Sequence, residues 1–399
     1  MKKLWVQKLI TCLVLLQLIS CGSGNSSINP VQPPPNPEAP QPETYHCYFD
    51  SRCPEIVISG DDISTDAFRG FADPSLEFDS STNTLWMSYS WLNVIVSNSA
   101  SPVIYDLVVR THLAKSTDNG NSFSFVREIN IPSPENHPDS GIEGLSVHEV
   151  SSLVKQSDVQ WQLTWLKYFT PLGTEPGIED RSDFLLWRTT ATTPENLGDN
   201  NEVWASTFST SDSWNAPVDL NSISELSDCA VLTEPALFNH NNQTYLSASC
   251  LVIDQTGRNT DRERLVLLSQ TSNGFNFVGD ILTANDASSF NADVFEQGDI
   301  SISKDGTVLL IVTPILLEES PAHQGCIVFE FEDFSTAQLK RNASRIPLAN
   351  NIITADSNME KGLCTYDAAS DTGIIMVLTE ISQGGTEVEF SMRATGVHP

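Results

Sequence analysis

The sequence predicts an all-β fold made of a repeated group of strands. From residue 55 to the C-terminus, short segments rich in β-branched and aromatic residues alternate with turns of Gly, Asn, Asp and Pro. No apolar pattern of helical period lasts for more than a turn or two. The pattern therefore excludes Rossmann and barrel enzymes of the α/β type, whose parallel strands need covering helices.

Six segments show the strand pattern most clearly. They are Glu55–Ser59, Leu85–Trp91, Tyr105–His112, Trp161–Phe169, Thr244–Ile253 and Val308–Thr313. The strands repeat in a set order: a short strand, a polar turn, a long apolar strand, and a third strand that ends in a second turn. Five such units open at Asp73, Glu149, Glu234, Asp299 and Lys361, which lie 62 to 85 residues apart.

The fifth unit is one strand short. Its strands are expected at Gly362–Ala368, Gly373–Ile381 and Val388–Thr395. The strand Glu55–Ser59, ahead of the first unit, can supply the missing outer strand and remove two exposed sheet edges. This order is similar to a five-bladed β-propeller of four-stranded blades, closed by an N-terminal strand. The alternative is two β-sandwich domains, and the regular order across residues 70–395 argues against it.

The composition bounds the partners. The 399 residues include 51 Asp and Glu against 21 Lys and Arg, which gives a formal net charge of −30. Salt-driven binding to nucleic acid or to an anionic membrane face needs a positive field, so this charge argues against both. It fits an exported protein, or one with an acidic cleft.

The first residues have the layout of a secretory signal. Three lysines precede the short apolar stretch Leu9–Ile19, which is too short to cross a membrane. The segment Leu18–Gly22 (LISCG) resembles the lipobox of bacterial lipoproteins, and this resemblance implies cleavage before Cys21 and lipidation of its sulfur. Several acyl chains on one residue anchor a protein durably. Gly22, in place of the Asp that retains lipoproteins in the inner membrane, favours the outer membrane, on its periplasmic or cell-surface face.

We therefore expect residues 1–20 to be the signal peptide, 21–54 a lipidated Cys and a tether, and 55–399 the folded domain. The tether begins with Gly and Ser and continues with Pro33, Pro34, Pro35, Pro37, Pro40 and Pro42. Such a segment is flexible first and extended later, and it holds a domain away from the bilayer.

Six cysteines remain after the signal and the lipidation site: Cys47, Cys53, Cys229, Cys250, Cys326 and Cys364. An even number in an exported chain predicts disulfides, and six cysteines allow fifteen connectivities. Cys47 and Cys53 can close a small loop, Cys229 and Cys250 flank one predicted hairpin, and Cys326 and Cys364 are left to pair. A zinc site would need a tighter ligand cluster such as Cys-x-x-Cys, and none exists.

The segment Ser116–Phe123 fits the pattern S-x-D-x-G-x-x-F. It resembles the Asp box of sialidases and related propellers, which is a structural turn on the blade rim. Asp118 is then expected to accept backbone N–H bonds, and Gly120 to supply a positive φ. A sialidase-like enzyme is a weaker alternative that rests on this box alone.

The openings of the innermost strands carry the candidate chemistry. Phe71–Leu76 (FADPSL) and Thr233–Phe238 (TEPALF) resemble the first and third catalytic motifs of glycoside hydrolase family 43. The resemblance implies that Asp73 is the general base and Glu234 the general acid. The second motif departs from the family: its Asp is absent, and Glu149 or Val150 stands in its place.

The resemblance implies a sugar-active site that uses paired carboxyls, one kept protonated and one ionised. Glu149 lies between Asp73 and Glu234 along the chain and can raise the pKa of the acid. Arg69, His148, Asp299 and Lys361 are further binding candidates in the funnel at the propeller axis. We expect no cofactor and no catalytic metal, although the axis leaves room for a structural cation.

The alternative function is a non-catalytic surface lipoprotein that binds a glycan or a protein. The missing second-blade Asp favours this alternative, whereas the pair Asp73 and Glu234 favours the enzyme. In either case the expected partners are a membrane, through the lipid, and a carbohydrate or surface protein.

Overall fold

A computed structural model describes residues 41–399, except for 48–52, 67, 98–103, 138–139, 173–181, 208–215, 256, 318, 320, 357–358 and 382–386. Cys21, the signal and most of the tether lie outside the described residues. Within the described part, no helix has the length and apolar character that a membrane crossing requires. The fold is all-β, as predicted.

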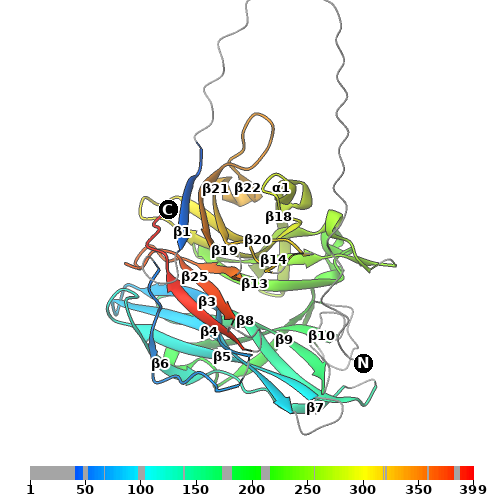
Figure 1. The fold of residues 1–399 in the computed structure, drawn as a ribbon. Coiled ribbons are helices and arrows are strands. Elements are labelled where there is room, and N and C mark those ends of the chain that lie inside the picture. The colour runs from blue at the N-terminus through cyan, green and yellow to red at the C-terminus, as the bar shows by residue number, and fades with distance from the viewer. Residues whose placement is uncertain are drawn as a thin grey trace, which may run out of the picture. The chain divides into compact units, whose positions relative to one another are not determined.

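In the first two units the four main strands pair antiparallel with their neighbours (Figure 1). The first consists of β3 (Phe68–Asp79), β4 (Thr84–Ser97), β5 (Ile104–Ser116) and β6 (Phe123–Glu128), with β2 (Ile58–Ser59) at its outer edge. The second consists of β8 (Glu143–Ser157), β9 (Gln160–Pro171), β10 (Ser182–Ala191) and β11 (Asn201–Ser206), with β7 (Pro134–Asn136) and β12 (Val218–Asp219) at its two edges.

The other three units follow the same plan. The third consists of β13 (Val231–His240), β14 (Gln243–Leu251), β17 (Arg264–Thr271) and β18 (Gly274–Thr283), and the hairpin β15 (Ile253–Asp254) and β16 (Gly257–Arg258) extends from it. The fourth consists of β19 (Val294–Ile302), β20 (Val308–Ile315), β21 (Cys326–Asp333) and β23 (Ala349–Ala355), with β22 (Gln338–Leu339) beside β21. The fifth consists of β24 (Lys361–Thr365), β25 (Ile375–Ile381) and β26 (Val388–Ala394).

Helical structure among the described residues is limited to single turns, as predicted. These are α1 (Ala284–Ser288), η2 (Pro194–Asn196), η4 (Leu220–Ser222), η5 (Ser224–Leu226), η6 (Thr260–Arg262) and η7 (Phe334–Thr336). The helix α1 begins with a capping box, in which Thr283 and Asp286 satisfy each other's backbone N–H groups. Each of the six predicted segments overlaps a strand, and most of these strands extend beyond the predicted bounds, whereas only Ile58 and Ser59 of the segment Glu55–Ser59 form one.

Neighbouring units are joined to one another by hydrogen bonds that involve side chains on or beside their first two strands. In three pairs of neighbouring units and in the pair formed by the fifth and first units, a backbone N–H donates to a Ser, Thr or Asp side chain; between the third and fourth units a Ser hydroxyl donates to a carbonyl. The bonds are Leu153 to Ser75, Leu237 to Ser152, Ser247 to Gly298, Tyr366 to Asp299 and Leu76 to Thr365. In Figure 1, β3, β8, β13 and β19 lie toward the middle of the described domain, and β6 and β7 toward its outside.

The segment ahead of the first unit contacts two units. The N–H of Ile56 donates to the carbonyl of Met392, and the N–H of Ala394 donates to the carbonyl of Pro54, so this part lies beside β26. The next residues, Ile58 and Ser59, instead pair with β6 of the first unit. One further strand was not predicted: β1 (Glu43–Cys47) pairs with β23 in parallel, within the residues assigned to the tether.

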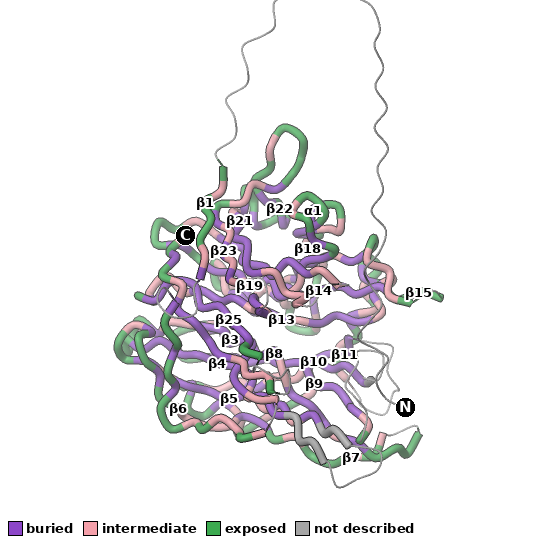
Figure 2. The backbone as a smooth tube through the Cα atoms, in the orientation of Figure 1, coloured by how far each residue is buried: buried purple, intermediate pink, exposed green. Residues whose placement is uncertain are grey.

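The interior is apolar, and the largest hydrophobic cluster spans the first three units and part of the fifth. Figure 2 shows buried backbone along the strands and exposed backbone in the connecting turns. Inward-facing residues alternate along strands such as β5, where Val109 and Leu113 are fully buried.

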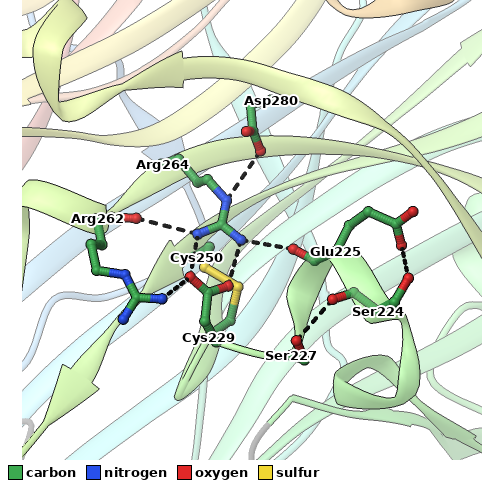
Figure 3. Close-up of a disulfide and its surroundings, with 9 residues drawn as sticks. Ser224, Glu225, Ser227, Cys229, Cys250, Arg262, Arg264 and Asp280 are labelled. Atoms are coloured by element: carbon green, nitrogen blue, oxygen red, sulfur yellow. Dashed lines mark hydrogen bonds and ion pairs between the residues drawn. A yellow bond between two sulfur atoms is a disulfide. The ribbon is translucent and has the colours of Figure 1, made fainter.

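The three disulfides are confirmed. They join Cys47 to Cys53, Cys229 to Cys250, and Cys326 to Cys364. All six cysteines are at least 95 % buried. Asp228, next to Cys229, pairs with Arg262 and with Arg264, each at 2.7 Å. Figure 3 shows these two arginines close to the second bridge.

Candidate active site

The first strand of every unit contains a β-bulge with one residue in the left-handed region. These residues are Asp73, Val150, Glu234, Gln297 and Leu363, with φ of 49°, 51°, 54°, 52° and 51°. In each case the register with the second strand shifts at this position. Bulges re-aim side chains and are enriched beside active sites, and non-glycine residues with positive φ carry strain. The five bulge residues therefore mark equivalent positions in the five units.

Among the bulge residues, Asp73 carries a carboxyl whose pKa is clearly shifted. Its side chain is buried, and burial together with the charge of Glu149 raises the pKa of its carboxyl to about 6. Hydrogen bonds from Ser90, from the backbone of Val150 and from Gln297 oppose that rise. Above this pH the carboxylate is ionised and can accept a proton from a water molecule, which is the role of a general base.

Gln297 brings the fourth unit to this carboxyl. Its Nε2 donates to Asp73 Oδ1 at 3.2 Å, although the two residues are 224 positions apart in the chain. Glu149 lies one residue before the bulge of the second unit, and Val150 occupies the bulge itself. The charge of Glu149 thus raises the pKa of Asp73, and an apolar residue, Val150, occupies the bulge of the second unit.

Glu234 occupies the bulge of the third unit and is partly buried. Thr233 Oγ1 lies 3.5 Å from Glu234 Oε1. Pro235 follows it, as Pro74 follows Asp73, so the two predicted carboxyls share both the bulge and the next residue. Because Pro lacks an N–H, it is tolerated in a strand at such a bulge.

The ion pair of His323 and Glu360 lies near the carboxyl of Asp73, and the sequence did not indicate His323. The carboxylate of Glu360 accepts from His323 Nδ1 and from the backbone N–H groups of Ala322 and His323, each at 2.8 Å. Burial alone would lower the pKa of His323, but the bond to Glu360 and the charges of Glu296, Glu360 and Asp73 raise it. The pKa of His323 therefore lies above its ordinary value, and Asp73 is one of the charges that raise it.

Arg258 completes this group. It comes from the hairpin of the third unit and pairs with Glu263 at 2.7 Å and with Glu296 at 2.8 Å. Glu296 is the residue before Gln297, so the ion pair flanks the bulge of the fourth unit. No local motif marks Arg258 or His323, because Arg258 lies in a short hairpin outside the four main strands of its unit and His323 lies in the connection between β20 and β21.

Gln297 could have been found from the sequence. The position three residues after the bulge is apolar or aromatic in every unit: Leu76, Leu153, Leu237, Ile300 and Tyr366. Alignment on that position puts Gln297 and Leu363 level with Asp73. The predicted opening of the fourth unit, Asp299, instead lies two residues beyond its bulge residue.

The four predicted binding residues have other contacts. Arg69 pairs with Glu389 at 2.7 Å and with Glu387 at 3.6 Å. His148 accepts from Trp165 Nε1 at 2.9 Å, and burial followed by the charge of Lys167 lowers the pKa of His148 to about 3. A neutral, buried His148 thus serves as an acceptor that fixes Trp165.

The other two lie elsewhere on the first strands. Lys361 is 3 % exposed and donates to the carbonyl of Met359. Asp299 accepts the N–H of Tyr366, and burial raises the pKa of Asp299 to about 7. Within the described part of the chain, these hydrogen bonds of Lys361 and Asp299 do not involve Asp73.

A cavity of about 470 Å³ lies along the first strands after the bulges. Each unit contributes a polar residue to its lining: Glu77, Lys155, Asn239, Asp299 and Asp367. Burial raises the pKa of the three carboxyls among them. None of Asp73, Glu149 and Glu234 lines this cavity.

The predicted Asp box forms a turn between β5 and β6. Ser122 donates to Asp118 through its backbone and its hydroxyl, and the N–H of Gly120 donates to Ser116. Gly120 has a φ of 87°, and Phe123 is 1 % exposed. These contacts stabilise the turn and leave Asp118 engaged in it.

Within the described ranges, one group brings three metal-type ligands together: Asp228, Cys229 and Cys250. The disulfide occupies both sulfurs, and Asp228 is engaged by two arginines. Thiolates are the sulfur species that bind metals, so this group does not fit a metal ion.

No protein-family model matches the sequence, and no curated protein matches it. Among solved structures, the fold is similar to Zg3597, a family 117 glycoside hydrolase of the marine bacterium Zobellia galactanivorans, with a TM-score of 0.49 at 9 % identity over 87 % of this chain and 92 % of that one. It is also similar to a GH43_1 enzyme of Xanthomonas citri complexed with xylose (TM-score 0.47, 8 % identity, 85 % and 89 % covered). An α-L-arabinofuranosidase of Lactobacillus brevis gives a TM-score of 0.46 at 9 % identity, with 84 % and 94 % covered. Similarity at this level assigns no activity to this chain.

Proposed function

We propose that the described domain is a five-bladed β-propeller and that the bulge residues surround a carbohydrate-active site. Two observations support the five-fold ring. Five equivalent bulges occur, one in each unit. Hydrogen bonds join each unit to the next, including Leu76 of the first unit to Thr365 of the fifth. The contacts of Pro54 and Ile56 with β26 support closure by the N-terminal segment.

The function that the geometry supports best is glycoside hydrolysis. The observation that carries it is Asp73: a buried carboxyl on a strained bulge, with its pKa raised to about 6 by burial and by Glu149. Hydrolysis of a glycosidic bond needs one ionised and one protonated carboxyl. In this proposal Asp73 activates water, Glu234 protonates the leaving oxygen, and Glu149 tunes Asp73.

The expected reaction is inverting. The carboxyls of Asp73 and Glu234 should then flank the bound sugar about 6.5–9.5 Å apart, which leaves room for water beside Asp73. The substrate is a neutral glycoside of the arabinoside, xyloside or galactoside type.

Isosteric variants test the proposal. Asp73→Asn and Glu234→Gln should each lower turnover of the active glycoside at least about 100-fold, because each removes a proton-transfer group. Asp261→Asn and Glu332→Gln are matched controls on exposed carboxyls and should keep wild-type rates. The assay uses aryl arabinosides, xylosides, galactosides and sialosides. Wild-type protein that hydrolyses none of them would remove the hydrolase proposal.

A second candidate function is glycan or protein binding without catalysis. Val150 favours it, because an apolar residue occupies the second bulge, where the family 43 pattern has a carboxyl. Equilibrium binding of the same sugars, without turnover, would support this candidate over hydrolysis.

The proposed location is the outer membrane, on its periplasmic or cell-surface face, through lipid on Cys21. The lipobox-like Leu18–Gly22 after a basic, apolar leader supports it. Incorporation of labelled palmitate into wild type, but not into Cys21→Ser, is the expected result. Equal incorporation, or none, would remove the lipoprotein assignment.

A further inference from the structure

Gln297 has an unusual combination of backbone conformation, burial and hydrogen bonding. It has a φ of 52° in the bulge of β19, it is 8 % exposed, and its Nε2 donates to Asp73. Its Oε1 is buried and has no hydrogen-bond partner among the described residues. A buried amide oxygen without a partner is unfavourable, and such groups in native structures call for an explanation.

The orientation of the amide follows from Asp73. An ionised carboxylate only accepts hydrogen bonds, so the amide must turn its N–H group toward Asp73 and its oxygen away. The oxygen then needs a donor. A sugar hydroxyl is a donor, whereas a carboxylate, sulfate or phosphate group offers only acceptors and would be repelled.

We propose that Gln297 is a positioning and specificity residue of this site, an inference that rests on the proposed sugar-active function. Its N–H holds the Asp73 carboxylate in place, and its Oε1 accepts a hydrogen bond from one hydroxyl of the sugar bound beside Asp73. The ligand class is therefore a neutral sugar with a free hydroxyl at that position.

The chain itself indicates which substitutions the backbone tolerates. Leu363 and Glu234 occupy the equivalent bulges with φ of 51° and 54°. Gln297→Leu and Gln297→Glu are therefore expected to fold, because each places at residue 297 a side chain that another unit already carries there. Gln338→Leu, at an exposed position on β22, is the matched control.

The two variants have distinct expected effects. Gln297→Leu removes both hydrogen bonds and should lower kcat/KM for the active aryl glycoside about 10-fold or more. Gln297→Glu places a second carboxyl against Asp73 and should move the acidic limb of the pH–rate profile to higher pH by about one unit or more. Melting temperatures of both variants and of Gln338→Leu report folding.

Monodeoxy sugars isolate the second hydrogen bond. Wild type should discriminate against the one deoxy analogue that lacks the bonded hydroxyl, and Gln297→Leu should lose that discrimination. A structural role for Gln297 would lower all rates equally and leave the discrimination intact.

The outcomes separate this inference from the proposed hydrolase. Wild-type rates and wild-type discrimination in Gln297→Leu, together with an unmoved acidic limb in Gln297→Glu, would overturn the inference and leave the hydrolase proposal in place. If wild type hydrolyses nothing but binds arabinose, xylose or galactose in calorimetric titration, and Gln297→Leu loses that binding, the inference stands and the hydrolase falls. If wild type neither hydrolyses nor binds any sugar of the panel, both are wrong.

Discussion

At the scale of single residues, the buried carboxylate of Asp73 is expected to destabilise the folded protein. The unfolded chain exposes this carboxyl to water, where the pKa has its ordinary value of 3.8. In the folded chain burial and Glu149 raise the pKa to about 6. The folded state therefore binds this proton more tightly than the unfolded state does, and the ionised form is the destabilised one.

The sign of the pH dependence follows. Between pH 4 and 6 the wild type loses stability as Asp73 ionises, up to about 3 kcal/mol for a shift of about two pKa units. Asp73→Asn removes the charge at every pH. Relative to wild type, this variant should thus be more stable at pH 8 than at pH 4, which means that its free energy of unfolding minus that of wild type is larger at pH 8.

Denaturant unfolding at the two pH values measures this difference. Asp261→Asn, on an exposed carboxyl, should show no such change between pH 4 and pH 8. A relative stability of Asp73→Asn that is the same at both pH values would show that the carboxyl of Asp73 is solvated in the folded protein.

The sequence indicated three carboxyls of the candidate site but not its Arg and His residues, for a physical reason. Asp73, Glu149 and Glu234 stand in the strand openings of a repeat, so their order along the chain predicts their level in the fold. Arg258 and His323 reach the site through long-range contacts from connecting segments, which no local period encodes.

At the scale of elements, the contact between β3 and β26 joins the first unit to the last. The two strands pair in parallel over three residues, Phe68 to Gly70. The approach is close at Gly70, where φ is +129° and an added Cβ would meet the carbonyl oxygen of Phe390 at 2.2 Å. Only a glycine fits there, because the obstacle is backbone and cannot move aside as a side chain can.

We expect Gly70→Ala to destabilise the domain by about 3 kcal/mol, through backbone strain and the clash with β26. Gly257→Ala is the matched control: its φ is +113°, and no atom lies within 4 Å of an added Cβ. Strain alone should make the control milder. Thermal unfolding of both variants measures the difference, and equal losses would show that β26 does not restrict residue 70.

The strand pattern was the most predictable level of this fold. Alternation and turn residues located the first strand and at least one other strand in each of the five units, because both signals are local. The pairing of β1 with β23 was not predictable in the same way. Its sequence, Glu43–Cys47, follows a proline-rich stretch, and its stability comes from an edge that lies about three hundred residues further along the chain.

At the scale of the whole molecule, the disulfides tie together parts that carry little other covalent constraint. Cys47–Cys53 connects the end of β1 to the segment that reaches β26, and Cys326–Cys364 connects the fourth unit to the fifth. Four of these six cysteines lie in one hydrophobic cluster with Ile353 and Ile374. Cys229–Cys250 stands apart, within the third unit and five residues before Glu234.

The loop lengths rank the three bridges by their effect on stability. The paired cysteines are 6, 21 and 38 residues apart for Cys47–Cys53, Cys229–Cys250 and Cys326–Cys364. In the chain-entropy description a longer closed loop restricts the unfolded chain more, which gives about 2, 3 and 4 kcal/mol respectively. Replacing each pair by two serines and measuring the free energy of unfolding should reproduce this order. The oxidised wild type, denatured without reductant, should show no reactive thiol among the six. A larger loss for the Cys47–Cys53 pair than for Cys326–Cys364 would mean that native contacts at the edge of β1, and not the entropy of the unfolded chain, set the contribution of the first bridge.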